Sequence, residues 1–261
     1  MCELFGLTSS EPVAAATCLI DFQQRGGGTG NNPDGWGLVY KADSRFLLAK
    51  EPVPAVQSQL YARLSADLCS DLILAHVRKA KYPLINTLVN THPFQHECCN
   101  KQWVFAHNGL IPEVIALELA YKHAVCSPDG QTDSEYAFCY MLRHIALQLK
   151  DGSPSASGSW FDTIAHVAEA IASYGQFNFL LSDGDYLIAY AHDRLHYLER
   201  QDRNANRDAV DVALIATEPL ASCMPWLPFE SGELRIYRQG RLVGDRKTHP
   251  PVPSRKSAAV L

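Results

Sequence analysis

The alternation of apolar and polar residues along the chain predicts strands and helices in mixed blocks. Short apolar runs bounded by glycine, proline or charged residues are typical of strands, whereas apolar positions that recur every three or four residues indicate amphipathic helices. Strands are expected at residues 2–8, 36–41, 46–50, 72–77, 103–106, 177–182, 186–191, 195–199, 213–217, 234–237 and 241–243. Helices are expected at residues 10–24, 56–69, 112–123, 132–149 and 160–174.

Glycine and proline mark several boundaries of these segments. Pro12 falls early in the first helix, and the glycine run from Gly26 ends it. Asp183-Gly184, between two apolar runs, is a strong hairpin signal. We expect a long loop from Arg78 to about residue 100, and loops longer than about 12–15 residues are usually functional or disordered. Because this loop lies directly after Arg78, we expect it to be functional.

The order of the elements decides between two layered architectures. Strands and helices do not alternate regularly, as they would in a parallel βαβ fold, and hairpins are frequent. We therefore expect an α+β domain built on antiparallel sheets. A single domain should span residues 1–245, and residues 246–261, which end in HPPVPSRKSAAVL, should form a loosely ordered tail.

Composition and charge exclude several classes of protein. The chain has 261 residues, of which 47% are hydrophobic and 20% charged, as in ordinary globular proteins. A net charge of -5 argues against a nucleic-acid partner, whose binding proteins are usually basic. No apolar stretch of about 18 residues predicts a membrane span. The first ten residues do not resemble a secretory signal, so we expect a cytoplasmic protein.

Cysteine is present eight times without a CxxC pair. In a reducing compartment most of these thiols should be small core residues, and a disulfide framework is not expected. Cys2 is different, because removal of Met1 would leave it with a free α-amino group, whose reference pKa is about 7.7–8.0. That group could take the thiol proton and return it to a leaving amine, as in N-terminal nucleophiles. The alternative is that Cys2 has no chemical role and is only a small residue at the start of a strand.

Three other segments carry candidate chemistry, and each has an ordinary structural alternative. Arg78 ends an apolar strand and could grip a carboxylate through two parallel hydrogen bonds, or form a surface ion pair. Asn108 and the N–H of Gly109 could stabilise one oxyanion, or form a common Asn-Gly turn. Asp133 lies inside a Thr-Asp-Ser-Glu capping box, where it could bind an ammonium or only offset the helix macrodipole.

Taken together and in order, these segments resemble the class II glutamine amidotransferases of the N-terminal-nucleophile hydrolase superfamily, in particular the stand-alone bacterial, YafJ-like type. The segments that carry the resemblance are MCELFG, QQRGG, NPDGWG, AHVRKA, NTHPF, AHNG, TDSE and ATEPL, between Met1 and Leu220. The resemblance implies a four-layer αββα sandwich of antiparallel sheets. It leaves about forty residues, too few for a synthase domain, so an ammonia-accepting synthase would be a separate protein.

The resemblance also implies a role for each matching residue. Cys2 would attack the side-chain carbonyl of glutamine and form a γ-glutamyl thioester, with Asn108 and Gly109 as the oxyanion hole. Arg78 would hold the α-carboxylate of the substrate and Asp133 its α-ammonium. Arg25 and Gly26 would help to shape the site. No metal and no cofactor is implied.

Other functions remain compatible with the same residues. The substrate could be another γ-glutamyl compound, because the sequence after Arg78, Lys-Ala-Lys-Tyr, differs from that of the purine-pathway members. The fold could serve binding without catalysis. A metal-binding module is a further alternative, because His92, His96, Cys98 and Cys99 crowd one segment, although their spacing is unusual for zinc.

Overall fold

The computed structural model describes residues 2–120, 125–150, 159–203, 206, 208–220 and 224–250. Its helices are α1 (Ala16–Arg25), α2 (Gln59–Asp67), α3 (Val114–Leu119), α4 (Asp133–Lys150) and α5 (Ser159–Ala172), with a 3-10 turn at Ala55–Gln57. Its strands are β1 (Glu3–Ala14), β2 (Trp36–Ala42), β3 (Arg45–Glu51), β4 (Cys69–Val77), β5 (Phe94–Cys98), β6 (Lys101–Leu110), β7 (Gln176–Ser182), β8 (Tyr186–Ala191), β9 (His196–Arg203), β10 (Ala209–Ala216), β11 (Leu227–Pro228), β12 (Glu233–Arg238) and β13 (Arg241–Lys247).

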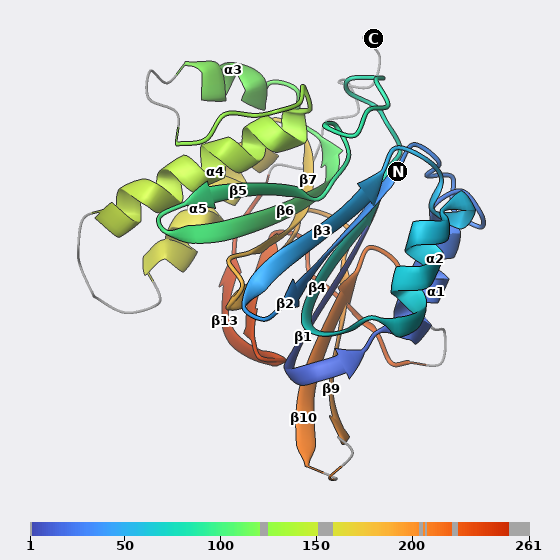
Figure 1. Ribbon diagram of the computed structural model, residues 1–261. Helices are drawn as coiled ribbons and strands as arrows, with labels where there is room; N and C mark the ends of the chain where they lie inside the picture. Colours follow the sequence, from blue (N-terminus) through green and yellow to red (C-terminus); the bar gives the residue numbers. More distant parts are fainter. Residues whose placement is uncertain are drawn as a thin grey trace.

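Two antiparallel sheets face each other between two layers of helices (Figure 1). The strand order is β11-β9-β10-β1-β4-β2-β3 in one sheet and β13-β12-β8-β7-β6-β5 in the other. One buried cluster joins α1 and α2 to the first sheet, a second joins α3, α4 and α5 to the other, and a third lies between the sheets. The architecture is the α+β, four-layer αββα sandwich that the sequence predicted.

Side chains that alternate along each strand explain how one sheet contributes to two of these clusters. Along β1, Phe5 and Leu7 pack towards the helices, whereas Leu4 packs towards the other sheet. This alternation follows from the period of two residues in a strand, which places neighbouring side chains on opposite faces. The first sheet is therefore covered on both sides, and its central strand β1 is held rigidly between β4 and β10.

Several boundaries differ from the sequence predictions. β1 continues to Ala14, so the helix expected from residue 10 begins only at Ala16, and its proline belongs to a strand. The loop expected up to residue 100 contains the edge strand β5. The tail expected from residue 246 is ordered at its start. β13 runs to Lys247, and Thr248 is buried and shares a hydrogen bond with the Tyr190 hydroxyl. Residues 251–261 lie outside the described residues.

The cysteines also depart from the expectation. Cys126 and Cys139 form a disulfide, although no disulfide framework was expected. Cys18 and Cys98 are buried thiols, as expected, whereas Cys69 and Cys99 are exposed. Cys223 lies outside the described residues.

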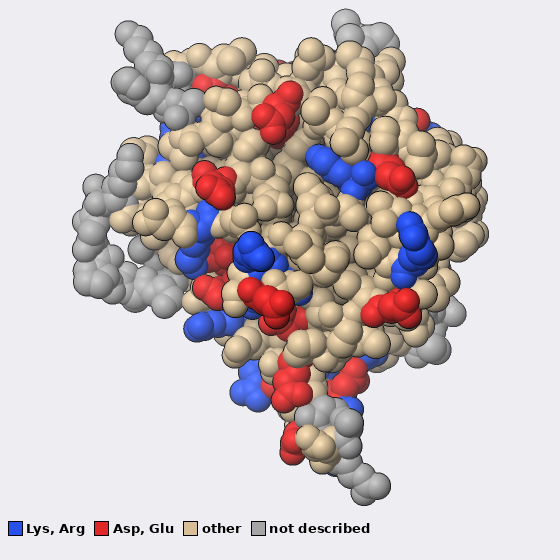
Figure 2. All heavy atoms as spheres, viewed as in Figure 1, with Lys and Arg blue, Asp and Glu red and all other residues tan. Residues whose placement is uncertain are grey.

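The distribution of surface charge and the length of the helices bear on two possible partners, nucleic acids and membranes. On the face shown in Figure 2, acidic and basic side chains are interspersed rather than gathered by sign. None of the helices within the described part of the chain is both long and apolar enough to span a bilayer.

Candidate active site

The pairing of β1 with β4 places Cys2 beside the residues that follow β4. Glu3 pairs with Val77, so the residue before Glu3 lies next to the residues after Val77. The backbone N–H of Lys79 donates a hydrogen bond to the Cys2 Sγ at 3.2 Å. Burial raises the pKa of the Cys2 thiol, and the Lys79 N–H and the charge of Arg78 only partly offset this effect. Burial therefore favours the neutral thiol over the thiolate.

Four of the candidate residues meet around one small cavity: Cys2, Arg78, Gly109 and Asp133. They come from the starts or ends of β1, β4, β6 and α4, which converge at one end of the sandwich. The cavity has a volume of about 20 Å³, room for about one water molecule.

A larger hollow of about 480 Å³ lies elsewhere, lined by residues such as Lys41, Phe46, Lys101 and Asp183. It contains none of the candidate residues and no thiol. Size alone would favour this hollow as a binding site. The chemistry favours the smaller cavity, because a thiol and two side chains of opposite charge meet there.

Arg78 is buried, and its guanidinium faces the loop that follows it. Its Nη1 donates to Ile85 O at 3.2 Å and to Asn86 Oδ1 at 3.4 Å, and its Nη2 lies 3.5 Å from Pro83 O. The guanidinium therefore satisfies loop carbonyls in this state. A carboxylate would offer it a stronger, charge-assisted pair of hydrogen bonds.

Asp133 is buried at the first turn of α4. Its Oδ2 accepts a hydrogen bond from Ile111 N at 2.7 Å and its Oδ1 one from Ser134 N at 2.8 Å. Burial raises the pKa of Asp133 to about 6, although these hydrogen bonds and Arg78 oppose the shift. A nearby ammonium would restore the charged form by replacing the lost hydration.

The capping box around Asp133 is only half formed. Thr132 Oγ1 accepts a hydrogen bond from Glu135 N at 3.2 Å, as predicted. The Glu135 carboxylate does not return to Thr132 and instead accepts hydrogen bonds from Asp129 N and Gly130 N. Glu135 thus fixes the segment before α4.

Asn108 and Gly109 belong to β6 rather than to a turn. They pair with Asn178 and Phe177 of β7, which excludes the ordinary Asn-Gly turn. A Cβ on Gly109 would lie 1.7 Å from Gln176 O, so only glycine fits this strand pairing. The buried Asn108 therefore holds its amide at a fixed place beside the cavity-lining Gly109.

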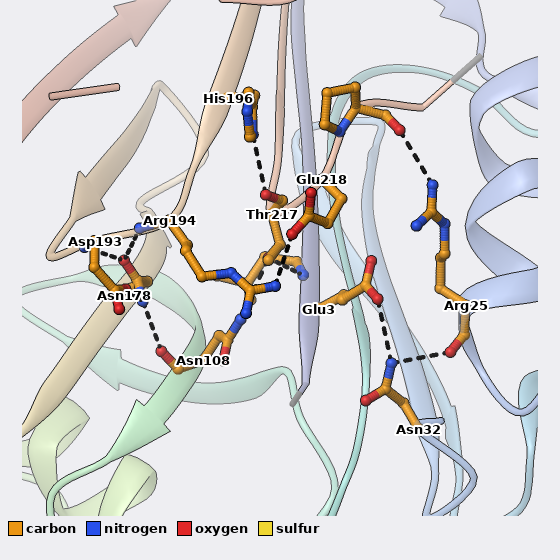
Figure 3. Close-up of polar contacts among 12 residues, drawn as sticks. Glu3, Arg25, Asn32, Asn108, Asn178, Asp193, Arg194, His196, Thr217 and Glu218 are labelled. Carbon is orange, nitrogen blue, oxygen red and sulfur yellow. Dashed lines mark hydrogen bonds and ion pairs between the residues drawn. The ribbon is translucent and has the colours of Figure 1, made fainter. Parts of the chain in front are cut away.

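Asn108 is connected to the strand that carries Cys2 through Thr217 (Figure 3). Asn108 Nδ2 lies 3.5 Å from Thr217 Oγ1, which also accepts a hydrogen bond from Leu4 N at 2.9 Å. On its other side, Asn178 Nδ2 donates to Asn108 O at 3.2 Å. Thr217 lies in the ATEPL segment of the resemblance, to which the sequence gave no role.

Arg25 and Gly26 do not line the cavity. Asn32 Nδ2 connects Arg25 O, at 3.0 Å, with the Glu3 carboxylate, at 3.4 Å (Figure 3). A Cβ on Gly26 would meet Ala55 Cβ at 2.5 Å, so glycine allows close packing behind the site. Arg25 is thus linked through Asn32 to Glu3, the residue after Cys2, whereas Gly26 packs against Ala55 and Val77.

Two further residues join the elements of the site; they lie in the resemblance segments AHNG and NPDGWG, but the sequence assigned neither of them a role. His107 Nδ1 lies 2.8 Å from Ser134 Oγ, so it links β6 to the start of α4, and burial lowers its pKa to about 4. Asp34 Oδ2 accepts a hydrogen bond from Ala80 N at 2.8 Å and fixes the turn after Arg78.

The segment considered as a metal module is divided by the fold. His92 lines the cavity and stacks on His76, with ring centroids 4.2 Å apart. His96 and Cys98 instead face α4, where they approach Glu135 and Leu142. The four residues of that segment therefore do not form one site.

The chain was compared with known protein families and relatives. The profile of the family described as "Glutamine amidotransferases class-II" matches residues 1–207. The putative glutamine amidotransferase YafJ of Escherichia coli K12 is 34% identical over 93% of this chain and 100% of its own length. The uncharacterized protein MJ1515 of Methanocaldococcus jannaschii is 33% identical over 95% of this chain and 72% of its own.

Solved structures agree with the fold. A predicted glutamine amidotransferase from Pseudomonas aeruginosa PA01 has a TM-score of 0.68 at 27% identity and covers 93% of this chain and 99% of its own. The glutamine phosphoribosylpyrophosphate amidotransferase from B. subtilis has a TM-score of 0.64 at 16% identity, over 94% of this chain and 49% of its own, a likeness of fold alone. The chain belongs to the class II glutamine amidotransferases, whose general reaction is the release of ammonia from the amide of glutamine.

Proposed function

We propose that the protein hydrolyses the side-chain amide of glutamine, or of a closely related γ-glutamyl compound, through a thioester on Cys2. The observation that carries this proposal is the meeting of Cys2, Arg78, Gly109 and Asp133 around one cavity. To bind an amino acid and cleave its side-chain amide, an enzyme needs a nucleophilic thiol, a cation and an anion for the α-carboxylate and α-ammonium, and a donor for the oxyanion. The cavity provides a thiol, a cation, an anion and a backbone amide.

The α-amino group of Cys2, freed by removal of Met1, is the base in this proposal. It takes the thiol proton as Sγ attacks the amide carbon, and it returns that proton to the nitrogen as ammonia leaves. Water then attacks the thioester carbon, which releases glutamate and regenerates the Cys2 thiol. The raised pKa of the Cys2 thiol supports a base-assisted attack over a preformed thiolate.

Asn108 and the N–H of Gly109 stabilise the oxyanion that forms on the carbonyl oxygen. Hydrogen-bond donors that are already held in place stabilise the developing charge without any cost of rearranging the site during the reaction. The rigid strand pairing of β6 and β7 and the link through Thr217 to Leu4 support this assignment. Thr217 is a positioning residue, because it joins the strand of the nucleophile to the amide.

Arg78 and Asp133 recognise the α-carboxylate and the α-ammonium of the substrate. The cavity holds about one water, so the loop after Arg78 must open to admit glutamine. As it opens, the guanidinium exchanges the carbonyls of Pro83 and Ile85 for the substrate carboxylate. Ammonia is the free product in this scheme, and a synthase that accepts it would be a partner of the protein.

Arg78→Lys and Asp133→Asn are both expected to lower kcat/KM for glutamine by about 10- to 150-fold, the equivalent of ~1.5–3 kcal/mol for a lost charged hydrogen bond. Lysine keeps the charge of Arg78 but not its two-pronged geometry. The measurement compares glutamine with its des-amino analogue and with other γ-glutamyl amides. Asp133→Asn should discriminate less than the parent against the des-amino analogue.

The matched control is Asp162→Asn, which removes the acid from the first turn of α5, remote from the cavity. It should leave kcat/KM unchanged. Equal discrimination by the parent and Asp133→Asn would reduce Asp133 to a helix-terminal residue and contradict the assignment of the ammonium site. If another γ-glutamyl amide is used far better than glutamine, the mechanism stands with that substrate.

The pKa of Asp133, about 6, gives a distinct pH dependence. Below that pH the carboxyl gains a proton and loses the charge that binds the ammonium. The α-amino base, with a reference pKa of about 7.7–8.0, already lowers kcat/KM as the pH falls. The logarithm of kcat/KM should therefore fall more steeply below about pH 6. Asp133→Asn should lack this steeper section, and a steeper section that persists in the variant would assign it to another group.

A further inference from the structure

A second cluster of reactive side chains lies between α4 and the sheet that contains β5 and β6, on the face of that sheet that points away from the sheet with β1. It consists of His96 on β5, Cys139 on α4 and Cys126 in the segment before α4. One ligand atom from each of these residues lies within 4.8 Å of the other two. The cluster does not include any residue of the candidate active site. Within the described part of the chain, no other group of histidine, cysteine or acidic residues is arranged this closely.

The fold explains why the three residues meet. α4 packs on β5, the edge strand of its sheet (Figure 1). His96 is on the face of β5 that meets the helix, where its ring lies against Phe138, with centroids 5.4 Å apart. Cys139 is buried on the same helix, and Cys126 packs against the same core from the preceding segment. Three separate elements therefore each contribute one side chain.

Glu135 holds the imidazole in place. His96 Nε2 lies 3.2 Å from Glu135 Oε1, and Glu135 is one helical turn before Cys139. Histidines that bind metals usually donate their second ring N–H to a carboxylate, which fixes the ring and leaves the other nitrogen for the ion. Because Glu135 also accepts hydrogen bonds from Asp129 N and Gly130 N, its carboxylate cannot turn away freely.

We propose that His96, Cys126 and Cys139 form a site for a thiophilic divalent cation, with Zn²⁺ as the best fit, when the two cysteines are reduced. Zinc binds sulfur at about 2.3 Å and imidazole nitrogen at about 2.0–2.1 Å in a tetrahedron, so its ligand atoms lie about 3–4 Å apart. Three ligand atoms within 4.8 Å need only a small adjustment to reach that arrangement. Water completes the tetrahedron.

The disulfide between Cys126 and Cys139 is the oxidised form of this site. A thiol reductant supplies two electrons and two protons, which opens the disulfide to two thiols and converts the reductant to its own disulfide. Zinc then displaces the two thiol protons and binds two thiolates, so binding releases protons and is favoured at higher pH. The doubly charged cation and the two thiolates balance in charge.

The position of the site gives it a structural effect. Cys126 is in the segment that leads to α4, and Glu135, the residue beside the cluster, anchors Asp129 and Gly130 of that segment. Either the disulfide or the metal ties this segment to the helix that begins at Asp133. Of the four residues His92, His96, Cys98 and Cys99 that the sequence suggested as a metal site, only His96 belongs to this cluster.

The direct test is the zinc content of the full-length protein. The protein is reduced with a phosphine, incubated with Zn²⁺ alone, desalted and analysed by mass spectrometry of the element. About one zinc ion per chain is expected for the parent, and less than about a tenth of that for Cys126→Ser and Cys139→Ser. Glu135→Gln should weaken zinc binding by about 10- to 100-fold, as loss of the carboxylate behind a ligating histidine does elsewhere.

Cys99→Ser is the matched control. Cys99 lies three residues from His96, and its Sγ is 2.8 Å from that of Cys98, so this vicinal pair is the competing thiol site. Cys99→Ser should keep its zinc. Loss of zinc from Cys99→Ser with retention by Cys126→Ser would move the site to the vicinal pair and overturn the proposal.

A second measurement uses only the parent protein. Zinc should protect the partly buried Cys126 from alkylation in the reduced, folded chain, whereas exposed Cys69 should react equally with and without zinc. Peptide mass spectrometry reports each cysteine separately. Equal alkylation of Cys126 in both conditions, or a reduced parent that retains no zinc, would show that the pair forms a disulfide only.

Discussion

Replacing Cys2 with alanine is expected to lower the rate of amide hydrolysis by a factor on the order of 10⁶, the loss seen when the nucleophile of a well-organised catalytic unit is removed. Among the residues that the structure describes, no other thiol lines the cavity. The Cys2 side chain is partly buried and makes its hydrogen bonds only to the backbone of Lys79. Alanine fits the same space, so the melting temperature should change little.

Cys69→Ala is the matched control for this variant. Cys69 is an exposed thiol at the start of β4, at the other end of the strand from Arg78. Its removal should leave kcat and KM unchanged. Ammonia release by Cys2→Ala at the parent rate would exclude the thioester mechanism, and an inactive Cys69→Ala variant would show that loss of activity is not specific to Cys2.

The second large effect is expected at Asn108. Asn108→Ala should lower kcat by about 100- to 1000-fold, or ~2.7–4 kcal/mol, with little change in KM, because an oxyanion-hole donor acts mainly in the transition state. The distance of 3.5 Å from Asn108 Nδ2 to Thr217 Oγ1 marks a weak hydrogen bond, so the amide is available to a stronger acceptor.

Thr217→Val helps to separate catalysis from stability at this position. Valine has nearly the shape of threonine but cannot accept the hydrogen bond from Leu4 N. We expect a lower melting temperature for Thr217→Val and a smaller fall in kcat than for Asn108→Ala. Steady-state kinetics and thermal unfolding of both variants supply the comparison. A normal kcat for Asn108→Ala would leave the oxyanion hole to the backbone and contradict the role of this side chain.

Local sequence patterns predicted the elements whose signals are local. The hairpin of β7 and β8 follows from two apolar runs around Asp183-Gly184, and the structure confirms it. The antiparallel α+β class followed from the order of the elements. β5 was missed because an edge strand with Gln95, His96 and Glu97 at its centre has little apolar alternation. The extension of β1 past Pro12 was missed because proline also suits the first turn of a helix.

The sequence supplied the candidate residues of the site but not their arrangement. The candidates Cys2, Arg78, Gly109 and Asp133 are far apart in sequence, and the order of the segments identified them through the family resemblance. The half-formed capping box, the strand position of Asn108 and the link through Thr217 depend on which strands pair. Strand pairing and the approach of Cys126 to Cys139 are long-range consequences of folding, for which a single sequence carries no local signal.

The central claim is that Cys2, with its own α-amino group free, is the nucleophile. Mass spectrometry of the intact protein, with and without an electrophilic glutamine analogue, tests it most directly. The account predicts a chain that lacks Met1 and gains one molecule of the analogue, which peptide mapping locates on Cys2, and no gain in the Cys2→Ala variant. An active preparation that retains Met1, or a label on another residue with Cys2 unmodified, would contradict it.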